Sequence, residues 1–215
     1  MLTGKTPAHP ARWSREILER IAPTLAEIGR PVHDPFAGTG ERLGKLCDSL
    51  GLAFTGTDIE AWPNTDPRVL VGEDSLDPTT YPTGRYLIVT SPVYFGNRIS
   101  SDYVGGPLPT TKLAGRHSYG ISLGRALEQR NLARLCLRTR RKEYDQAHTD
   151  IAKLWGDLAA VNVDGKARDQ WRRILEGAGY EIADVLEVTT KRLGGGLAGA
   201  DKRAPHEVVL LAVRP

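Results

Sequence analysis

Short apolar stretches alternate along this chain with stretches in which apolar and polar residues recur at helical spacing. The apolar pattern predicts strands that end at Asp34 or lie at 52–58, 69–75, 85–90, 158–163, 180–190 and 208–213. The amphipathic pattern predicts helices that begin near Ser14 or cover 41–47, 123–144, 151–155 and 169–176. Strands that alternate with helices in this way are typical of an α/β domain with a largely parallel sheet.

The first predicted helix begins after Ser14, a residue type that accepts hydrogen bonds from the free N–H groups of a helix start. Its apolar positions share one face and are Ile17, Leu18, Ile21 and Leu25. Pro23 lies within this stretch and lacks the N–H group that a helix interior uses. We therefore expect the helix to break at Pro23 or to end early.

The sequence H-D-P-F-A-G-T-G, residues 33–40, joins the first predicted strand to the next helix. Its two glycines allow a sharp turn and a close approach of the backbone to a ligand. Leu43 stands where a dinucleotide-binding fingerprint needs its third glycine, and Thr39 and Leu46 interrupt the P-loop pattern. A turn that opens with Asp34 and lacks these phosphate-binding patterns suits a phosphate-free ligand with a cationic or zwitterionic end. S-adenosylmethionine (AdoMet) is such a ligand, and a strand-to-helix turn in some other α/β domain is the alternative.

Composition narrows the class of protein. The 215 residues are 40% hydrophobic and 26% charged, which is typical of a globular domain. The first residues lack the apolar core of a signal peptide and no stretch approaches a membrane span, so we expect a soluble, cytoplasmic protein without a membrane partner. Cys47 and Cys136 form no C-x-x-C pair, which predicts core thiols and no metal site. The net charge of +3 neither requires nor excludes nucleic acid.

The heptapeptide D-P-F-A-G-T-G at 34–40 resembles the AdoMet-binding motif D-P-F-x-G-x-G of the amino-methyltransferases that act on DNA bases. The resemblance implies that AdoMet is the cofactor and that it contacts residues from four segments of the chain. These residues are His9, Pro10, Asp34, Phe36, Ala37, Gly38, Thr39, Gly40, Asp58, Ile59, Asp74 and Ser75.

The segments outside the heptapeptide each have an expected role. The H-P-A sequence at 9–11 resembles the family's motif before a helix, whose free N–H groups suit the methionine carboxylate. Asp58 ends a strand at the distance beyond the glycine turn where a carboxylate binds ribose hydroxyls. Asp74 resembles the acid that accepts a hydrogen bond from the adenine amino group, with Ser75 beside the ring. The alternatives are an ordinary capped surface helix for 9–11, a plain loop acid for Asp58, and an acid capping the next turn for Asp74.

The fourth predicted strand leads into Ser91-Pro92-Val93-Tyr94. This segment resembles the catalytic motif (D/N/S)-P-P-(Y/F/W) of the same family and its longer form T-S-P-P-Y, found in enzymes that methylate the N4 amine of cytosine. Val93 replaces the second proline. The resemblance implies that Ser91 Oγ and the Pro92 carbonyl accept the hydrogens of the base amine. Tyr94, with Phe95, would stack on a base turned out of the duplex.

Residues 100–124 are rich in Gly, Pro, Ser and Thr, which predicts either a functional loop or a disordered segment, within an insertion at about 97–150. Because the segment directly follows the expected catalytic strand, it is a candidate substrate lid. In the helical stretch that follows, Arg130, Arg134 and Arg138 recur every four residues and therefore share one helix face. Such a row matches a phosphate backbone, so we expect these side chains to bind the substrate. A solvated charged face is the alternative.

Together, the resemblance implies a single Rossmann-like class I methyltransferase domain over 1–215, with a mostly parallel seven-stranded sheet whose last strand is antiparallel. The expected reaction is methyl transfer from AdoMet to the exocyclic amine of a DNA base, with cytosine N4 favoured over adenine N6. The alternatives are methylation of RNA or of another planar amine, and a catalytically weak AdoMet-binding module. The expected partner is DNA rather than RNA, and target recognition would come from residues 100–144, from a homo-oligomer or from a separate partner.

Overall fold

The computed structural model describes residues 13–58, 62, 64–92, 141–189 and 206–215. The helices in these ranges are α1 (Arg15–Ile28), α2 (Glu41–Ser49), α5 (Arg141–Leu154) and α6 (Arg168–Gly177), with the 3₁₀ helices η1 (Pro78–Thr80) and η4 (Gly165–Ala167). The strands are β1 (Val32–Asp34), β2 (Phe54–Asp58), β3 (Val69–Val71), β4 (Leu87–Thr90), β5 (Leu158–Asp164), β6 (Glu181–Thr189) and β7 (His206–Val213). None of the described helices combines the length and the apolar character that a transmembrane span requires.

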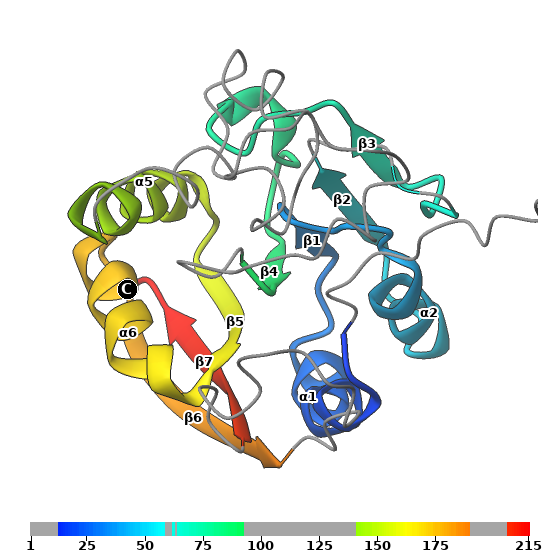
Figure 1. Cartoon of the computed structure of the whole chain (residues 1–215). Helices are drawn as coiled ribbons and strands as arrows, with labels where there is room; N and C mark the ends of the chain where they lie inside the picture. The colour runs from blue at the N-terminus through cyan, green and yellow to red at the C-terminus, as the bar shows by residue number, and fades with distance from the viewer. Residues whose placement is uncertain (1–12, 59–61, 63, 93–140, 190–205) are drawn as a thin grey trace, which may run out of the picture.

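The strands form one seven-stranded sheet in the order β3-β2-β1-β4-β5-β7-β6 (Figure 1). All neighbouring pairs from β3 to β5 are parallel, whereas β7 is antiparallel to both β5 and β6. The chain order reverses between β1 and β4, which is the position where open α/β sheets bind ligands. The expected α/β, Rossmann-like sheet with an antiparallel last strand is therefore confirmed.

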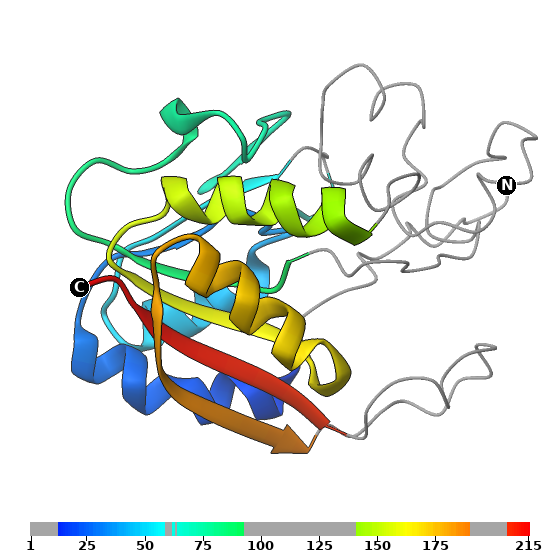
Figure 2. The same ribbon diagram turned by 90° about the vertical axis from the view of Figure 1, so that its left-hand side faces the viewer.

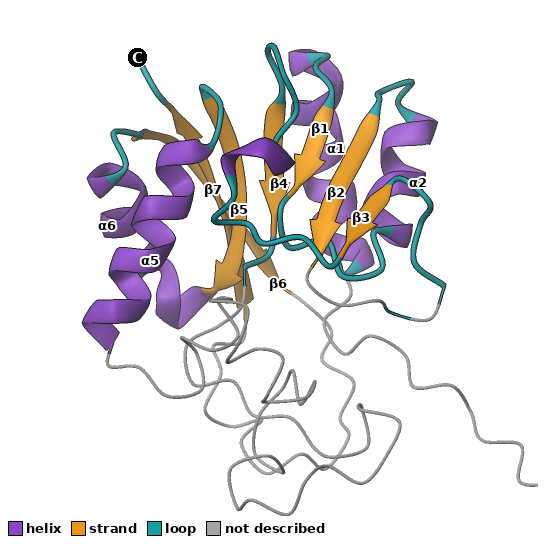
Figure 3. Ribbon diagram, turned by 90° about the horizontal axis from the view of Figure 1, so that it is seen from above, coloured by secondary structure: helices purple, strands orange, loops and turns teal. Residues whose placement is uncertain are grey.

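Helices cover both faces of this sheet (Figure 2 and Figure 3). The core beneath α1 and α2 contains Leu87 and Val89 of β4, and the core beneath α5 and α6 contains Ile88. Because successive side chains of a strand point to opposite faces, one short strand supplies both cores. Burial on both faces explains why β4 is apolar throughout its length.

Helix α1 continues through Pro23, contrary to the expected break. Ser14 Oγ accepts a hydrogen bond from the Ile17 backbone N–H at 3.2 Å, so the helix begins where the sequence predicts. The side chains of Ile17, Ile21 and Leu25 are each at most 1% exposed. Burying each contributes about 1.5–3 kcal/mol, whereas an interior proline costs about 3 kcal/mol, so the apolar face outweighs the proline. Pro23 itself is exposed.

Strand β3 is shorter than the expected 69–75 stretch. It ends at Val71, and Gly72 follows with φ +85°, a left-handed conformation that glycine adopts readily. The acid at 74 therefore lies in a turn beyond the strand. Leu70 and Val71 are the large hydrophobic side chains that this edge strand leaves exposed.

Part of the predicted 97–150 insertion is described. Residues from Arg141 form α5, in which Tyr144, His148 and Ile151 are buried, and this helix packs against α6. Residues 97–140, with the expected lid, the arginine row and Cys136, lie outside the described ranges. Cys47 is buried as expected, and burial raises the pKa of its thiol to about 12.

Candidate active site

The carboxyl ends of β2, β1 and β4 lie next to one another at one edge of the sheet (Figure 3), and we call this edge the active edge. Asp58 and Asp34 are the last residues of β2 and β1, and Ser91 directly follows β4. Three predicted site segments that are far apart in the sequence are thus neighbours. Open parallel sheets bind their ligands at this edge, which makes it the candidate active site.

Two glycines in left-handed conformations form the turn that follows β1. Gly38 has φ +58° and Gly40 has φ +65°, backbone conformations that residues with a Cβ rarely adopt. A Cβ on Gly40 would also approach Val69 Cγ2 to 2.5 Å. Gly40 then caps α2. The shape of the turn therefore requires the glycines that the sequence pattern singles out.

Gly56 of β2 allows this turn to pack directly on the sheet. A Cβ at Gly56 would lie 2.7 Å from Ala37 Cβ and 3.2 Å from the Asp34 carbonyl oxygen. The Ala37 N–H donates to the Thr57 carbonyl oxygen at 3.0 Å, which holds the turn against β2. The sequence analysis missed Gly56, although a glycine inside a strand is a known sign of close backbone approach.

Asp34 is 1% exposed and joins three elements. Its Oδ1 accepts hydrogen bonds from Thr90 Oγ at 2.6 Å and from the Phe36 N–H at 3.0 Å. Its Oδ2 accepts from Trp13 Nε1 at 3.4 Å. Burial raises the pKa of this carboxyl to about 7, although the three donors oppose that shift. Asp34 therefore ties β1 to β4 and to the start of α1, and its expected contact with AdoMet stays a prediction.

Asp58 holds the glycine turn from the neighbouring strand. Its Oδ2 accepts a hydrogen bond from the Gly38 N–H at 2.8 Å, and its carbonyl oxygen accepts from the Gly72 N–H at 2.8 Å. The residue is partly exposed, and each carboxylate oxygen can accept more than one hydrogen bond. Asp58 thus lies beside the turn as expected of a ribose-binding acid, while the ribose contact stays a prediction.

Asp74 and Ser75 form a turn after β3. Asp74 Oδ1 accepts from the Leu76 N–H at 2.9 Å, and the Ser75 carbonyl oxygen accepts from the Tyr81 hydroxyl at 2.7 Å. Burial raises the pKa of Asp74 above its ordinary value. The bond from the Leu76 N–H to Oδ1 agrees with the alternative role of Asp74, an acid that caps the next turn. The expected adenine contact of Asp74 stays a prediction.

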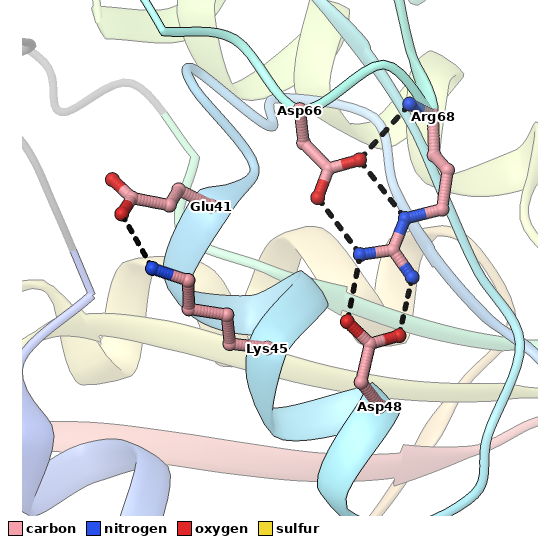
Figure 4. A network of polar contacts seen from close by, with 5 residues as sticks. All are labelled: Glu41, Lys45, Asp48, Asp66 and Arg68. Carbon is pink, nitrogen blue, oxygen red and sulfur yellow. Dashed lines mark hydrogen bonds and ion pairs between the residues drawn. The ribbon is translucent and has the colours of Figure 1, made fainter.

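Arg68 forms a brace behind the glycine turn, shown in Figure 4. Its guanidinium donates to Asp48 at 2.6 and 3.1 Å and to Asp66 at 2.8 and 2.9 Å. It also lies over the Phe54 ring, 5.3 Å from the ring centroid. The Asp66 N–H donates to the Thr39 carbonyl oxygen at 2.7 Å. The brace therefore connects α2 and the segment before β3 to the turn itself.

Ser91 reaches a polar pair that the sequence analysis missed. Ser91 Oγ lies 3.5 Å from Asn162 Nδ2, and the same Nδ2 donates to Glu207 Oε2 at 2.8 Å. Pro92 follows Ser91 and is buried. The sequence carried one signal for this pair, a single asparagine within the apolar 158–163 stretch.

The remaining predicted site residues fall outside the described ranges. They are His9, Pro10, Ile59, Tyr94, Phe95, Arg130, Arg134 and Arg138, and Val93 lies there too. Their roles in cofactor and substrate binding stay predictions.

Comparison with known proteins gives the fold a precedent. Neither the family models nor the curated proteins include a match to this sequence. Among solved structures, magnesium protoporphyrin IX methyltransferase from Synechocystis PCC 6803 with bound SAM aligns with a TM-score of 0.50 and 15% identity, over 93% of this chain and 78% of that one. The same enzyme with bound SAH aligns with a TM-score of 0.51 and 14% identity, over 93% and 82% of the two chains.

Protein 1320 of Thermoplasma acidophilum also aligns, with a TM-score of 0.51 and 14% identity, over 99% of this chain and 92% of that one. At identities this low, the similarity shows a shared fold. The fold is the Rossmann-like arrangement of the Synechocystis methyltransferase.

Proposed function

We propose that this protein is an AdoMet-dependent methyltransferase that modifies the exocyclic amine of a DNA base, with cytosine N4 favoured over adenine N6. The observation that carries the proposal is the meeting of the glycine turn, Asp58 and Ser91 at the active edge. Methyl transfer needs a cofactor site and an amine-binding site next to each other. The order of the strands brings the two candidate segments together, which supports this reaction over cofactor binding alone.

The described residues fit AdoMet as the cofactor. The turn at Gly38 and Gly40 allows the backbone to approach a ligand closely, and it lacks the sequence patterns of phosphate-binding loops. Asp58 would accept hydrogen bonds from the ribose hydroxyls, and Asp74, beyond the end of the next strand along the sheet, would accept one from the adenine amino group. When bound, AdoMet supplies an electrophilic methyl group on its sulfonium sulfur.

Ser91 and Pro92 supply the acceptors for the substrate amine. An exocyclic base amine is a poor nucleophile because its lone pair is delocalised into the ring. Ser91 Oγ and the Pro92 carbonyl oxygen accept hydrogen bonds from the two N–H groups of the amine. These bonds draw the nitrogen toward tetrahedral geometry and free its lone pair. The gain in rate then comes from positioning and electrostatics. Ser91, rather than Asp or Asn, in this motif favours cytosine.

DNA as the partner rests on the arginine row of Arg130, Arg134 and Arg138. If these side chains contact phosphates, the logarithm of the DNA affinity falls linearly with the logarithm of salt concentration. Arg134→Ala then lowers the magnitude of that slope by about 1. The same slope in the variant and the wild type would show that the row is a solvated face.

A labelling experiment tests the reaction. The purified protein is incubated with methyl-labelled AdoMet and, separately, with duplex DNA, single-stranded DNA and RNA, and the digested nucleosides are identified. We expect label on N4-methylcytosine from DNA. Label on N6-methyladenine would show that the modified base is adenine and not cytosine. Label in RNA alone would favour the RNA alternative. Bound AdoMet without label in any sample would contradict the proposal and favour the catalytically weak binding module. The sequence feature that points to such a module is Val93, which replaces the second proline of the catalytic motif.

Two variants separate the cofactor site from the amine site. Asp58→Ala is expected to weaken AdoMet binding measured by calorimetry. Ser91→Ala is expected to abolish methyl transfer and to leave AdoMet affinity largely intact. Unchanged affinity in Asp58→Ala would remove this acid from the cofactor site, and lost affinity in Ser91→Ala would move Ser91 into it.

A further inference from the structure

We propose that Asn162 positions the Ser91 hydroxyl and that Glu207 sets the direction of the Asn162 amide. This inference rests on the proposed role of Ser91 in methyl transfer. Asn162 is 3% exposed and lies in β5 between apolar neighbours. Its Nδ2 lies within reach of both Glu207 Oε2, at 2.8 Å, and Ser91 Oγ, at 3.5 Å. Glu207, Asn162 and Ser91 thus form one continuous polar chain that ends at the active edge.

Strand register explains why these three side chains meet. β4 and β5 pair in parallel with Thr90 opposite Val161, so the next residues along, Ser91 and Asn162, are lateral neighbours. β5 and β7 pair antiparallel with Asn162 opposite Val209. Glu207 is two residues from Val209 on the same strand face, which makes it the diagonal neighbour of Asn162.

The chemistry of Glu207 fixes which end of the amide faces it. An ionised carboxylate only accepts hydrogen bonds, so Asn162 must present its NH₂ group to Glu207. The second hydrogen of that NH₂ group is then available to Ser91 Oγ. Ser91 therefore accepts a hydrogen bond from inside the protein, and its own hydroxyl proton and remaining lone pair face away from Asn162.

Packing alone does not account for an asparagine at this position. Asn162 Oδ1 is buried and has no hydrogen-bond partner among the described residues. A buried polar atom without a partner costs about 1–3 kcal/mol, which a valine in this apolar strand would avoid. A functional constraint on the NH₂ end of the same side chain explains why the amide is kept.

A reversal of the pair's polarity tests the proposal. In the double variant Asn162→Asp/Glu207→Gln, the amide introduced at position 207 can donate to the carboxylate introduced at position 162, so the pair is kept with its direction inverted. The carboxylate at 162 can only accept hydrogen bonds, so it would accept one from the Ser91 hydroxyl and turn that hydroxyl toward itself. We expect AdoMet affinity to stay within about threefold of the wild type and kcat for methyl transfer to fall about 100-fold, the scale of a misplaced catalytic group.

Glu207→Gln and Glu207→Ala complete the test. Glu207→Gln keeps an oxygen that can accept from Asn162 and should retain most of kcat, whereas Glu207→Ala should lose about tenfold with little change in KM. Asp157→Asn is the matched control, because Asp157 pairs with Arg30 and Arg85 before β5 begins, at the opposite edge of the sheet. It changes a carboxylate to an amide and should leave kcat unaltered.

The outcomes separate the two proposals. An active wild type together with wild-type kcat in the inverted pair would overturn the positioning role and leave the proposed function standing. An inverted pair that fails to fold, as judged by its thermal transition, leaves the decision to Glu207→Ala, whose wild-type kcat would also overturn the role. A wild type that methylates none of the nucleic acids would overturn the proposed function, and the positioning role with it.

Discussion

Thr90 at the end of β4 donates a 2.6 Å hydrogen bond to Asp34 at the end of β1, and both side chains are at most 1% exposed. This bond connects the strand that leads into Ser91 to the strand that opens the glycine turn. The candidate amine site and the candidate cofactor site are therefore joined through the protein interior.

Thr90→Val keeps the side-chain shape and removes the hydroxyl donor from the buried Asp34 carboxyl. We expect the free energy of unfolding, measured in urea, to fall by about 1–3 kcal/mol. Thr79→Val is the control, because Thr79 makes the same kind of bond to Asp77, at 2.7 Å, on the exposed surface. The control should change stability by less than about 0.5 kcal/mol. Equal losses in the two variants would show that burial of the Asp34 bond has no special weight.

The raised pKa of Asp34 predicts a pH dependence of stability. Its pKa is about 7 in the folded protein, above the value near 3.9 of an unfolded Asp. Between about pH 4 and pH 7, Asp34 therefore carries a proton in the folded state that it has lost in the unfolded state. Its contribution to stability falls as pH rises through this range. The difference in unfolding free energy between wild type and Asp34→Asn should shrink by at most about 1.4 kcal/mol per pH unit in this window, and be constant above it. A difference that grows with pH would contradict a raised pKa.

His148 predicts the opposite pH dependence. Burial lowers its pKa to about 3. Its Nδ1 lies 2.9 Å from the Tyr144 carbonyl oxygen, and the centroids of the His148 and Trp171 rings are 4.8 Å apart. The folded-state pKa is below the unfolded value of 6.5, so this contribution is complete above pH 6.5 and is lost as pH falls toward 3. His148→Phe fills the same aromatic cluster and should make the loss of stability between about pH 6.5 and pH 4 shallower. His33, whose pKa burial lowers to about 4, should account for part of the remaining slope. Identical slopes in wild type and variant would show that His148 does not titrate in this range.

Gly56→Ala tests whether the glycine turn depends on close contact with β2. The added Cβ would lie 2.7 Å from Ala37 Cβ, so the turn must shift. We expect a loss of about 1–3 kcal/mol in unfolding free energy, and a weaker AdoMet affinity by calorimetry. Gly177→Ala is the matched control, since its Cβ would meet Thr149 Cγ2 at an ordinary 3.4 Å. If Gly56→Ala behaves like this control, the turn does not need the contact.

Arg68→Met tests the brace behind the turn. The side chain of Arg68 is 34% exposed and that of Asp48 57% exposed, so solvent screens the pair, and we expect a loss of about 1 kcal/mol in unfolding free energy. AdoMet affinity should also fall, because Asp66 holds the Thr39 carbonyl. Lys45→Met is the control, because it removes the exposed Lys45–Glu41 pair of α2, the helix that also carries Asp48 (Figure 4). It should leave the unfolding free energy and the AdoMet affinity nearly unchanged. A variant at 68 with wild-type affinity would separate the brace from the cofactor site.

Local signals in the sequence were sufficient for much of the fold. Ser14 caps α1 as predicted, the glycines at 38 and 40 adopt left-handed conformations, and the apolar run at 87–90 is a strand buried on both faces. Each of these features depends on residues within a few positions of one another. The failure at Pro23 has a different origin, because the burial of α1 against the sheet outweighs a local helix breaker.

By itself, the sequence determined the class of fold, the glycine turn and the acids and serine that end or follow the strands, because helix caps, turns and strand periodicity act over short distances. Only the tertiary structure decided that Asp34 bonds Thr90, that Gly56 must lack a Cβ beside Ala37, and that Asn162 lies between Ser91 and Glu207. These relationships depend on which strands pair and in which register. That choice is made by the burial of two apolar cores assembled from the whole chain, so no short stretch of sequence contains it.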